Sequence, residues 1–210
     1  MSILDPFKRV QRLRQADPKR RADADLRERI PPGQYRTEKF PVLTYGETPV
    51  VDLKTWRLKV WGLVENSFTL SWEELQALPR KKIHVDIHCV TRWSLLDSEW
   101  EGVPFAAIAE RAKPLPSALA VMQHSYGGYT TNMLIEEMYD DEVILADMFG
   151  GEPLERDHGG PLRLVVPKLY FWKSAKWLNG LEFIDHNAPG FWERYGYHMH
   201  GDPWAEERFG

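Results

Sequence analysis

The amino-acid sequence predicts a β-rich α+β fold, in which mixed β-sheets are combined with a few short helices. The main observation is that short apolar runs recur along the chain and are bounded by Pro and Gly turn signals, as in short strands. Helix signals are fewer, and each of them is short. The chain has 210 residues and 43% of them are hydrophobic, which is enough for a substantial core. We expect a single domain over residues 31–210, after a charged segment over residues 1–30.

The N-terminal part of the chain is expected to contain few regular elements. Residues 1–30 carry frequent charges and few large apolar side chains, which favours an exposed helix or a partly ordered arm. Pro and Gly at short intervals predict extended, irregular chain over residues 34–55. A strand is predicted over residues 56–61. The Ser-Trp-Glu-Glu sequence that begins at Ser71 is a capping box, and it predicts a short helix that continues through Leu78.

Strands predominate in the rest of the chain. Alternating or continuous apolar runs predict them over residues 83–88, 118–122, 143–146, 162–166 and 181–184. Helical segments are expected between these strands, at residues 105–113 and 134–139. The Gly-rich residues 126–131 predict a turn or tight loop, and Gly150-Gly151 predicts a hairpin turn.

Composition restricts the partners and the location that can be expected. The net charge of −4 and the pI near 6.0 argue against nucleic-acid binding, which usually requires a basic surface. The apolar runs are too short to cross a bilayer, so no membrane insertion is expected. No apolar segment follows a basic start near Met1, as it would in a secretory signal. Together with a single unpaired cysteine, these features predict a cytoplasmic protein.

Cys89 is the only cysteine in the chain, and it lies where the strand predicted over residues 83–88 passes into a loop. A lone sulfur at this place is compatible with inert core packing, with a nucleophile, or with a single thiolate ligand to a metal. A nucleophile needs a base, for which His88 and His124 are the candidates. His84 and His88 have a zinc-ligand spacing only on a helix, whereas this segment predicts a strand.

A second group of polar residues lies in the C-terminal half. Gly159-Gly160 lets a ligand approach the backbone closely, because glycine has no Cβ. Arg163 and Lys176 supply positive charge and Ser174 supplies a donor, a set that suits a phosphate or a planar polar heterocycle. For Arg163 alone, the alternation with apolar neighbours favours a solvated outer face of the strand. Many aromatic residues also lie between residues 170 and 204, which predicts either a packed core or the wall of a cleft.

Four segments together resemble the molybdopterin-binding domain of the sulfite-oxidase-like oxidoreductases, in particular their short, haem-free bacterial members. The resemblance covers residues 31–205. Cys89 corresponds to the cysteine that binds molybdenum in that family. Residues 125–131 match its Gly-Tyr-Thr-Thr loop, and residues 158–167 match its His-Gly-x-Pro-x-Arg-x-x-x-Pro run. Residues 174–177 match the Lys-Trp segment that follows in the same order.

The resemblance implies a cofactor, molybdopterin with one molybdenum, and a sulfite-oxidase-type fold with mixed sheets around it. Cys89 would be the thiolate ligand of the metal, since a soft ligand suits a soft metal centre. Arg92 would meet a polar or anionic substrate beside the metal, so that Cys89 and Arg92 are the implied catalytic residues. The residues implied to bind the cofactor are Phe40, Leu43, Thr44, Cys89, Ser125, His158, Arg163, Ser174, Ala175 and Lys176.

The implied activity is oxygen-atom transfer to or from a small oxo donor or acceptor. Vertebrate and plant sulfite oxidases have a more basic run after their cysteine than the Cys-Val-Thr-Arg-Trp sequence of this chain, so sulfite is not the favoured substrate. The length leaves no room for the haem and immunoglobulin-like domains of those enzymes, which implies a separate electron-transfer protein. Two alternatives stay open at this point: a cysteine-nucleophile enzyme that uses Cys89 with a nearby histidine, and a non-catalytic carrier of the molybdenum cofactor.

Overall fold

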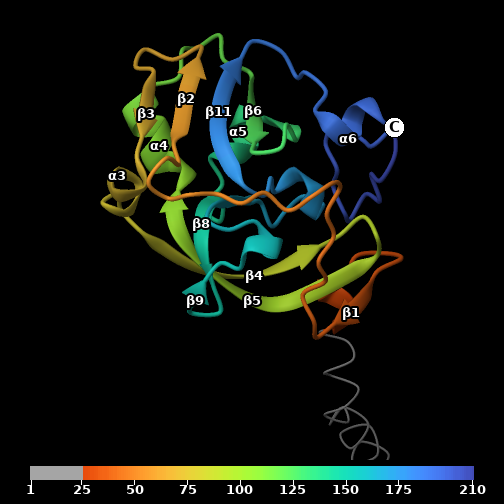
Figure 1. Ribbon diagram of the computed structural model, residues 1–210. Coiled ribbons are helices and arrows are strands. Elements are labelled where there is room, and N and C mark those ends of the chain that lie inside the picture. The colour runs from red at the N-terminus through yellow and green to blue at the C-terminus, as the bar shows by residue number, and fades with distance from the viewer. Residues whose placement is uncertain (1–25) are drawn as a thin grey trace, which may run out of the picture.

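The computed structural model describes residues 26–210, in which two mixed β-sheets pack around shared apolar side chains (Figure 1). The six strands of one sheet are β1 (Tyr35–Thr37), β4 (Lys81–His88), β5 (Trp93–Pro104), β8 (Ile144–Phe149), β9 (Glu152–Pro153) and β10 (Arg163–Val165). The five strands of the other sheet are β2 (Leu58–Gly62), β3 (Phe68–Leu70), β6 (Ala120–Ser125), β7 (Thr130–Leu134) and β11 (Leu178–Ile184). Each sheet combines one parallel pair, β1 with β5 or β2 with β11, with antiparallel pairs. The predicted β-rich mixed fold is therefore confirmed.

Short helices connect the strands: α3 (Trp72–Gln76), α4 (Phe105–Ala112), α5 (Ile135–Met138), α6 (Phe191–Arg194) and the 3₁₀ segments η1 (Arg156–His158) and η2 (Phe171–Lys173). The capping box before α3 is confirmed, because the Glu74 amide donates to Ser71 Oγ at 3.2 Å and the Ser71 amide donates to the Glu74 carboxylate at 2.7 Å. Residues 26–29 are helical, and the rest of the predicted N-terminal arm lies outside the described residues. Across residues 26–210, every helix is too short or too polar to pass through a bilayer.

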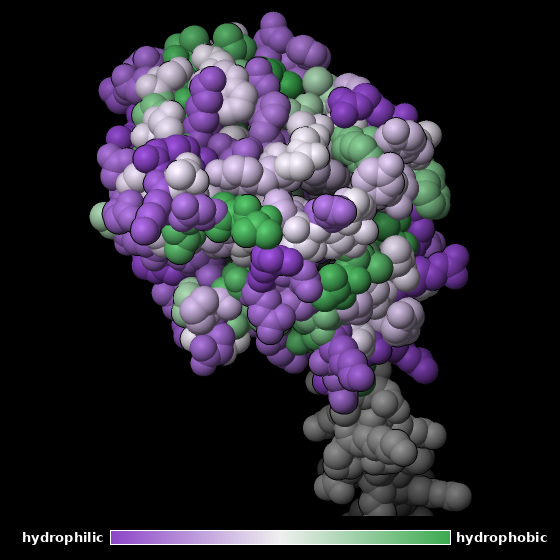
Figure 2. Space-filling view, in the orientation of Figure 1, coloured by the Kyte–Doolittle hydropathy of each residue, from purple (hydrophilic) through white to green (hydrophobic). Residues whose placement is uncertain are grey.

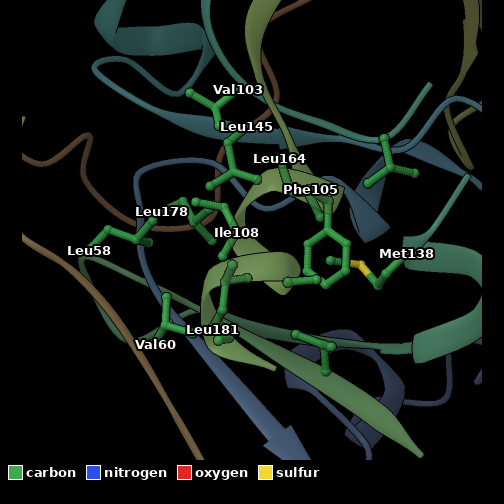
Figure 3. Packing of buried hydrophobic residues seen from close by; sticks show 14 of the residues in the cluster. Leu58, Val60, Val103, Phe105, Ile108, Met138, Leu145, Leu164, Leu178 and Leu181 are labelled. Atoms are coloured by element: carbon green, nitrogen blue, oxygen red, sulfur yellow. The ribbon is translucent and has the colours of Figure 1, made fainter. Parts of the chain in front are cut away.

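The main core lies between the two sheets and around α4 (Figure 3). Leu58 and Val60 of β2 point inward, as the alternation of that strand predicts, and both are fully buried. Phe105 and Ile108 occupy the buried face of α4, and Leu164 comes from β10 of the opposite sheet. Because side chains from both sheets pack together here, the two sheets hold each other in place and fix the loops at their ends.

Several strands differ from the sequence-based prediction: the short strands β1, β3 and β9 were not predicted, and β5 and β7 differ more substantially. β5, the 12-residue strand Trp93–Pro104, was not predicted, because two irregularities interrupt its alternation. The register shifts between Val85 and Ile87 on the β4 side, and between Glu101 and Gly102 on the β8 side. The predicted loop over residues 126–131 is shorter than expected, since β7 already begins at Thr130 and pairs with β6.

Residues 38–55 cross the front of the molecule between β1 and β2 without helix or strand (Figure 1). The Pro and Gly spacing predicts irregular chain over residues 34–55, and β1 at Tyr35–Thr37 departs from that prediction. Hydrophobic side chains interrupt the polar surface along this segment (Figure 2), where Val42, Leu43 and Val50 are exposed. The segment contributes one edge of the cleft described next.

Candidate functional site

A cleft of about 430 Å³ opens between segments that are far apart in the sequence. It is lined by residues from the irregular 40–45 segment, the turn after β4, the Gly127-Gly128 turn, η2 with residues 174–177, and α6. Aromatic side chains supply much of its surface: Phe40, Tyr45, Trp93, Tyr129, Phe171, Trp172, Trp177, Phe191, Trp192 and Tyr197. The C-terminal aromatic residues therefore form a cleft wall, the second of the two interpretations that the sequence allowed.

Cys89 lies in the lining of this cleft, in a tight turn between β4 and β5. We call residues 89–92 the cysteine turn. The Cys89 amide donates to Trp93 O and the Arg92 amide donates to Cys89 O, both at 2.9 Å. The thiol is 8% exposed, and its sulfur accepts a hydrogen bond from Thr91 Oγ1 at 3.2 Å. Burial raises the pKa of the thiol, so the thiolate that a metal requires has to be stabilised by the metal itself.

The structure does not support a base for a nucleophilic Cys89. His88 Nδ1 is bonded to Ser94 Oγ at 2.8 Å, and burial lowers the pKa of this histidine to about 4. His124 Nε2 is bonded to Glu182 at 2.9 Å. In the described part of the chain neither histidine forms a hydrogen bond with the thiol. Residues 26–210 contain no group of three or more His, Cys, Asp and Glu side chains arranged to hold a metal ion.

Arg92 is not among the residues that line this cleft. It closes the cysteine turn with a left-handed φ of +79°, its side chain is exposed, and it is absent from the cleft lining formed by residues 26–210. Val90 and Thr91 line the cleft instead. The tight turn explains the difference, because the reversal of the chain at Arg92 sends successive side chains in different directions.

Arg163 corrects the interpretation that favoured a solvated outer face. The residue is 1% exposed, because η2 and the following residues cover the face that alternation assigned to solvent. Its guanidinium donates to His158 O at 2.7 Å and to Ser174 O at 2.9 Å, and it lies 4.1 Å from the centre of the Phe171 ring. Burial lowers the pKa of Arg163 to about 9, yet the group lines the cleft as a fixed positive charge at neutral pH.

Lys176 brings a second positive charge into the cleft lining. Its Nζ donates to Thr44 Oγ1 at 3.0 Å and to Asp157 O at 2.7 Å. Burial, followed by the nearby Arg163 charge, lowers the pKa of Lys176 to about 8. Two cations held this close favour an anion between or beside them, which fits the phosphate expected from the sequence.

The other predicted cofactor-binding residues surround the same cleft. Phe40, Leu43, Thr44 and Ser174 belong to its lining. Ser125, His158 and Ala175 are not in the lining but adjoin it: Ser125 O accepts from the Gly128 amide, and Ala175 lies between Ser174 and Lys176. The His158 ring stacks on Phe40 with the ring centres 3.9 Å apart. His158 Nδ1 and Ser125 Oγ are buried, and neither has a hydrogen-bond partner among residues 26–210. Buried polar atoms without partners are costly, so these two atoms are suited to a polar ligand.

The glycines of the site serve two different purposes. At Gly127 and Gly128, both with positive φ, a Cβ would meet no atom within 4 Å, so this turn leaves open space beside the cleft. A Cβ on Gly160 would lie 2.1 Å from Leu154 O, and one on Gly159 would lie 3.0 Å from Lys176 Cβ. Gly159-Gly160 is therefore required by close packing of the chain, and not by close approach of a ligand as the sequence suggested.

One part of the site was not predicted: a buried ion pair that holds the α6 wall. Lys173 Nζ and Glu193 Oε1 are 2.7 Å apart and both side chains are fully buried. The Glu193 carboxylate also accepts from Trp172 Nε1 at 2.9 Å and Thr131 Oγ1 at 3.0 Å. This network ties α6, which carries Phe191 into the cleft wall, to η2 and β7. No local pattern pairs residues twenty positions apart, so the sequence contained no signal for it.

Comparisons with known proteins agree with this arrangement. The family model described as oxidoreductase molybdopterin binding domain matches residues 45–192. The chain is 49% identical over 187 residues to the uncharacterised oxidoreductase YuiH of Bacillus subtilis (strain 168), and the match covers 89% of this chain and 94% of YuiH. It is 29% identical to MsrP, the catalytic subunit of a protein-methionine-sulfoxide reductase of Gluconobacter oxydans, over 70% of this chain and 54% of that protein.

A solved structure shares the fold. The sulfane dehydrogenase SoxCD from Paracoccus pantotrophus matches with a TM-score of 0.62 and 23% identity, over 71% of this chain and 42% of the other. At this identity the likeness concerns the fold alone. The chain also spans only about half the length of the MsrP relative. The comparisons thus bear on the family and the architecture, and leave the substrate to chemical argument.

Proposed function

We propose a reaction for this protein from one established premise: the chain belongs to the family of oxidoreductases that carry a molybdopterin-binding domain. It is a molybdenum-dependent enzyme of the sulfite-oxidase type, and its cofactor is molybdopterin with one molybdenum. We propose further that Cys89 is the protein ligand of the metal and that the enzyme transfers an oxygen atom. The observation that carries this proposal is the position of the only thiol in the lining of a cleft without a histidine bonded to it.

The polar residues of the cleft fit the cofactor. Ser125 Oγ and His158 Nδ1 are buried atoms that lack partners and can each form one hydrogen bond to a polar ring system. Arg163 and Lys176 provide fixed positive charge for a phosphate, and the Gly127-Gly128 turn leaves room beside them. When bound, the cofactor supplies two-electron redox chemistry and the exchange of an oxygen atom. The protein residues hold it, keep the Cys89 sulfur at the cleft and limit the access of water.

The lining near the thiol favours a neutral organic substrate over a small oxyanion. Val90, Trp93, Phe171 and Tyr197 offer apolar and aromatic surface, and Arg92 is not in the lining. The Arg163 guanidinium is engaged by backbone carbonyls. Two relatives at 29% and 26% identity are named protein-methionine-sulfoxide reductases. We therefore propose that the substrate is a sulfoxide, which takes up two electrons and two protons and leaves as a thioether and water.

The electrons are proposed to come from a separate electron-transfer protein in the cytoplasm. The predicted domain boundary at residue 31 stays part of this proposal. The alternative of a cysteine nucleophile is disfavoured, because no base contacts the thiol within the described chain and burial raises the thiol pKa. The alternative of a non-catalytic carrier gives way to the oxidoreductase family of the chain.

The test is to produce the protein in a host that makes molybdopterin and to measure metal, pterin and activity together. We expect about one molybdenum per chain and reduction of an aryl or alkyl sulfoxide by a chemical reductant. Cys89→Ser should abolish turnover and lower molybdenum retention while the circular dichroism spectrum stays unchanged. Thr91→Val, which removes only the hydrogen bond to the sulfur, is the matched control and should keep its metal.

Two results would contradict the proposal. Full activity in Cys89→Ser would exclude the ligand role, and rapid alkylation of Cys89 by iodoacetamide in the metal-loaded protein would favour the nucleophile instead. Turnover of sulfite with no turnover of sulfoxides would overturn the substrate class while the metal assignment survived.

A further inference from the structure

The carbonyl groups of the cysteine turn are held by residues outside the region that matches the family model. Gln34 Nε2 donates to Cys89 O at 3.1 Å, and Arg208 Nη1 donates to Val90 O at 2.6 Å. The Tyr35 amide donates to Arg92 O at 2.8 Å. These donors come from two chain segments, residues 31–35 and 203–210, which we call the clasp. Both segments lie outside residues 45–192.

The two segments of the clasp also contact each other. Arg208 Nη2 donates to Pro32 O at 3.4 Å, and a Cβ on Gly33 would lie 3.1 Å from the Glu206 carboxylate. The Arg208 guanidinium lies 5.0 Å from the centre of the Tyr170 ring, which limits its movement. Figure 1 shows the C-terminal end of the chain on the same side of the molecule as the turn between β4 and β5.

The C-terminal segment is itself anchored, so that Arg208 does not reach the turn on a loose end. The Gly210 amide donates to Gly196 O at 3.2 Å, and Tyr197 pairs with Phe209 as an isolated bridge. His200 Nδ1 is bonded to Glu207 at 2.6 Å, immediately before Arg208. Tyr197 belongs to the cleft lining, so the clasp is continuous with the cleft wall.

A clasp of this kind has a direct effect on the sulfur. Apart from it, the cysteine turn is closed by two backbone hydrogen bonds and contains a non-glycine residue with left-handed φ, Arg92. Such a turn changes conformation easily unless its surroundings determine it. Gln34 holds the peptide that follows Cys89 through the Cys89 carbonyl, and the Arg208 guanidinium holds the next peptide, between Val90 and Thr91, through the Val90 carbonyl. The direction of the Cys89 Cα–Cβ bond, and hence of the sulfur, follows from the peptides on either side of Cys89. Gln34 holds one of these directly, and Arg208 holds it through the adjoining peptide of the turn.

We infer that Arg208 and Gln34 are positioning residues, which hold the cysteine turn in the one conformation that directs the Cys89 sulfur to the metal. This inference rests on the proposed ligand role of Cys89. Substitution of residues that orient a metal ligand typically lowers metal affinity or activity about 10- to 100-fold. The orienting groups of this chain come from its clasp, which lies outside residues 45–192.

The first test uses protein without cofactor, so it does not depend on the metal. Arg208→Met removes the donors and keeps the apolar stem, and we expect iodoacetamide to alkylate Cys89 about 10-fold faster than in the wild type. The rate of hydrogen exchange of the amides in the cysteine turn should rise together with the alkylation rate. The matched control is Arg57→Met, since Arg57 Nη1 also donates to backbone carbonyls, Trp56 O at 2.6 Å and Lys54 O at 3.1 Å, away from the cleft.

The second test uses the metal-loaded enzyme. Arg208→Met should change the Mo(V) electron paramagnetic resonance signal and lower kcat about 10-fold while KM changes little. Arg208→Lys, which retains one donor for Val90 O, should restore most of the wild-type Mo(V) signal and most of kcat. Gln34→Leu provides an independent variant should Arg208→Met fail to fold, and it should show the same changes to a smaller degree.

Equal alkylation rates for Arg208→Met and Arg57→Met would overturn the inference, as would an unchanged Mo(V) signal. An increase in KM alone would also overturn it, because Arg208 would then act on the substrate. If the wild type contains no molybdenum, the proposed function fails, whereas the alkylation rates still decide whether the clasp holds the turn.

Discussion

The two walls of the cleft are built in different ways. The wall that contains Arg163 and Lys176 comes from one stretch of chain, and its cations are held by nearby backbone carbonyls such as His158 O and Asp157 O. A second wall, the aromatic wall, combines α6 with the irregular 40–45 segment; the two are far apart in the sequence and meet where Tyr45 packs on Phe191. It depends on the buried Lys173–Glu193 pair. The comparison teaches that the wall proposed to bind the cofactor, here called the cofactor wall, is held mainly by contacts within one stretch of chain, whereas the aromatic wall requires contacts between distant segments.

The largest expected effect comes from breaking the buried pair of the aromatic wall. Lys173→Met leaves the Glu193 charge buried without its partner, and we expect the free energy of unfolding to fall by about 3–5 kcal/mol. The matched control is Lys82→Met, whose partner Glu99 lies 2.9 Å away at the surface; because solvent screens this exposed pair, its loss should cost far less stability than the loss of the buried pair. Urea denaturation measures both, and equal losses would show that the buried pair does not hold the wall.

Removing the central cation of the cofactor wall should have the next largest effect. Arg163→Met leaves His158 O and Ser174 O without their donor, so we expect a loss of about 1–3 kcal/mol in the protein without cofactor. Pterin content should fall as well. Lys176→Met, at the partly buried position, should lower pterin content with a smaller loss of stability. Normal pterin content in both variants would remove these residues from the cofactor site.

The exposed edge of the aromatic wall should affect the substrate more than the fold. Tyr45 is 71% exposed and packs on Phe191 with the ring centres 5.0 Å apart. Tyr45→Ala should change the free energy of unfolding by less than about 0.5 kcal/mol. We expect KM for a sulfoxide to rise about 2- to 10-fold, which corresponds to one lost aromatic contact. Steady-state kinetics decide this, and an unchanged KM would place the substrate elsewhere.

The smallest expected effect is a pH dependence of the C-terminal segment. Burial opposes protonation of His200, but Glu137 and Glu207 outweigh it and raise the His200 pKa above its ordinary value of 6.5. The stabilisation of the folded protein by protonated His200 is therefore complete below pH 6.5 and is lost as the pH rises through the raised pKa. His200→Gln should flatten the stability profile above pH 6.5, as measured by thermal unfolding at a series of pH values. If the stability of His200→Gln changed with pH in the same way as that of the wild type, His200 would not be the group responsible.

At acid pH, protonation of Glu207 weakens the His200–Glu207 pair. Burial opposes ionisation of this carboxylate, but hydrogen bonds from the Asp202 amide and from His200 lower its pKa below 4.5. The contribution of Glu207 to the free energy of unfolding is therefore present above pH 4.5 and disappears as the pH falls through the lowered pKa. The clasp should accordingly be most stable between these two limits.

The sequence predicted the cleft better than it predicted the surroundings of each residue. Ser174 and Lys176, which belong to a matched motif, line the cleft, as do Phe40, Leu43 and Thr44, which the family resemblance implied. Arg92 is exposed and does not line the cleft, and spacing along the chain does not reveal which way a tight turn directs a side chain. The burial of Arg163 was missed from the alternation because η2 covers a face that a single strand would expose to water.

By itself the sequence determined the β-rich class, the short strands and the order of the chemical motifs around Cys89. These features depend on local properties, such as side-chain alternation, Pro and Gly punctuation and residue identity. Only the tertiary structure decided that Gln34 and Arg208 hold the cysteine turn and that Lys173 meets Glu193. Such contacts join residues separated by many positions, and they form because two packed sheets bring distant loops to the same end of the molecule.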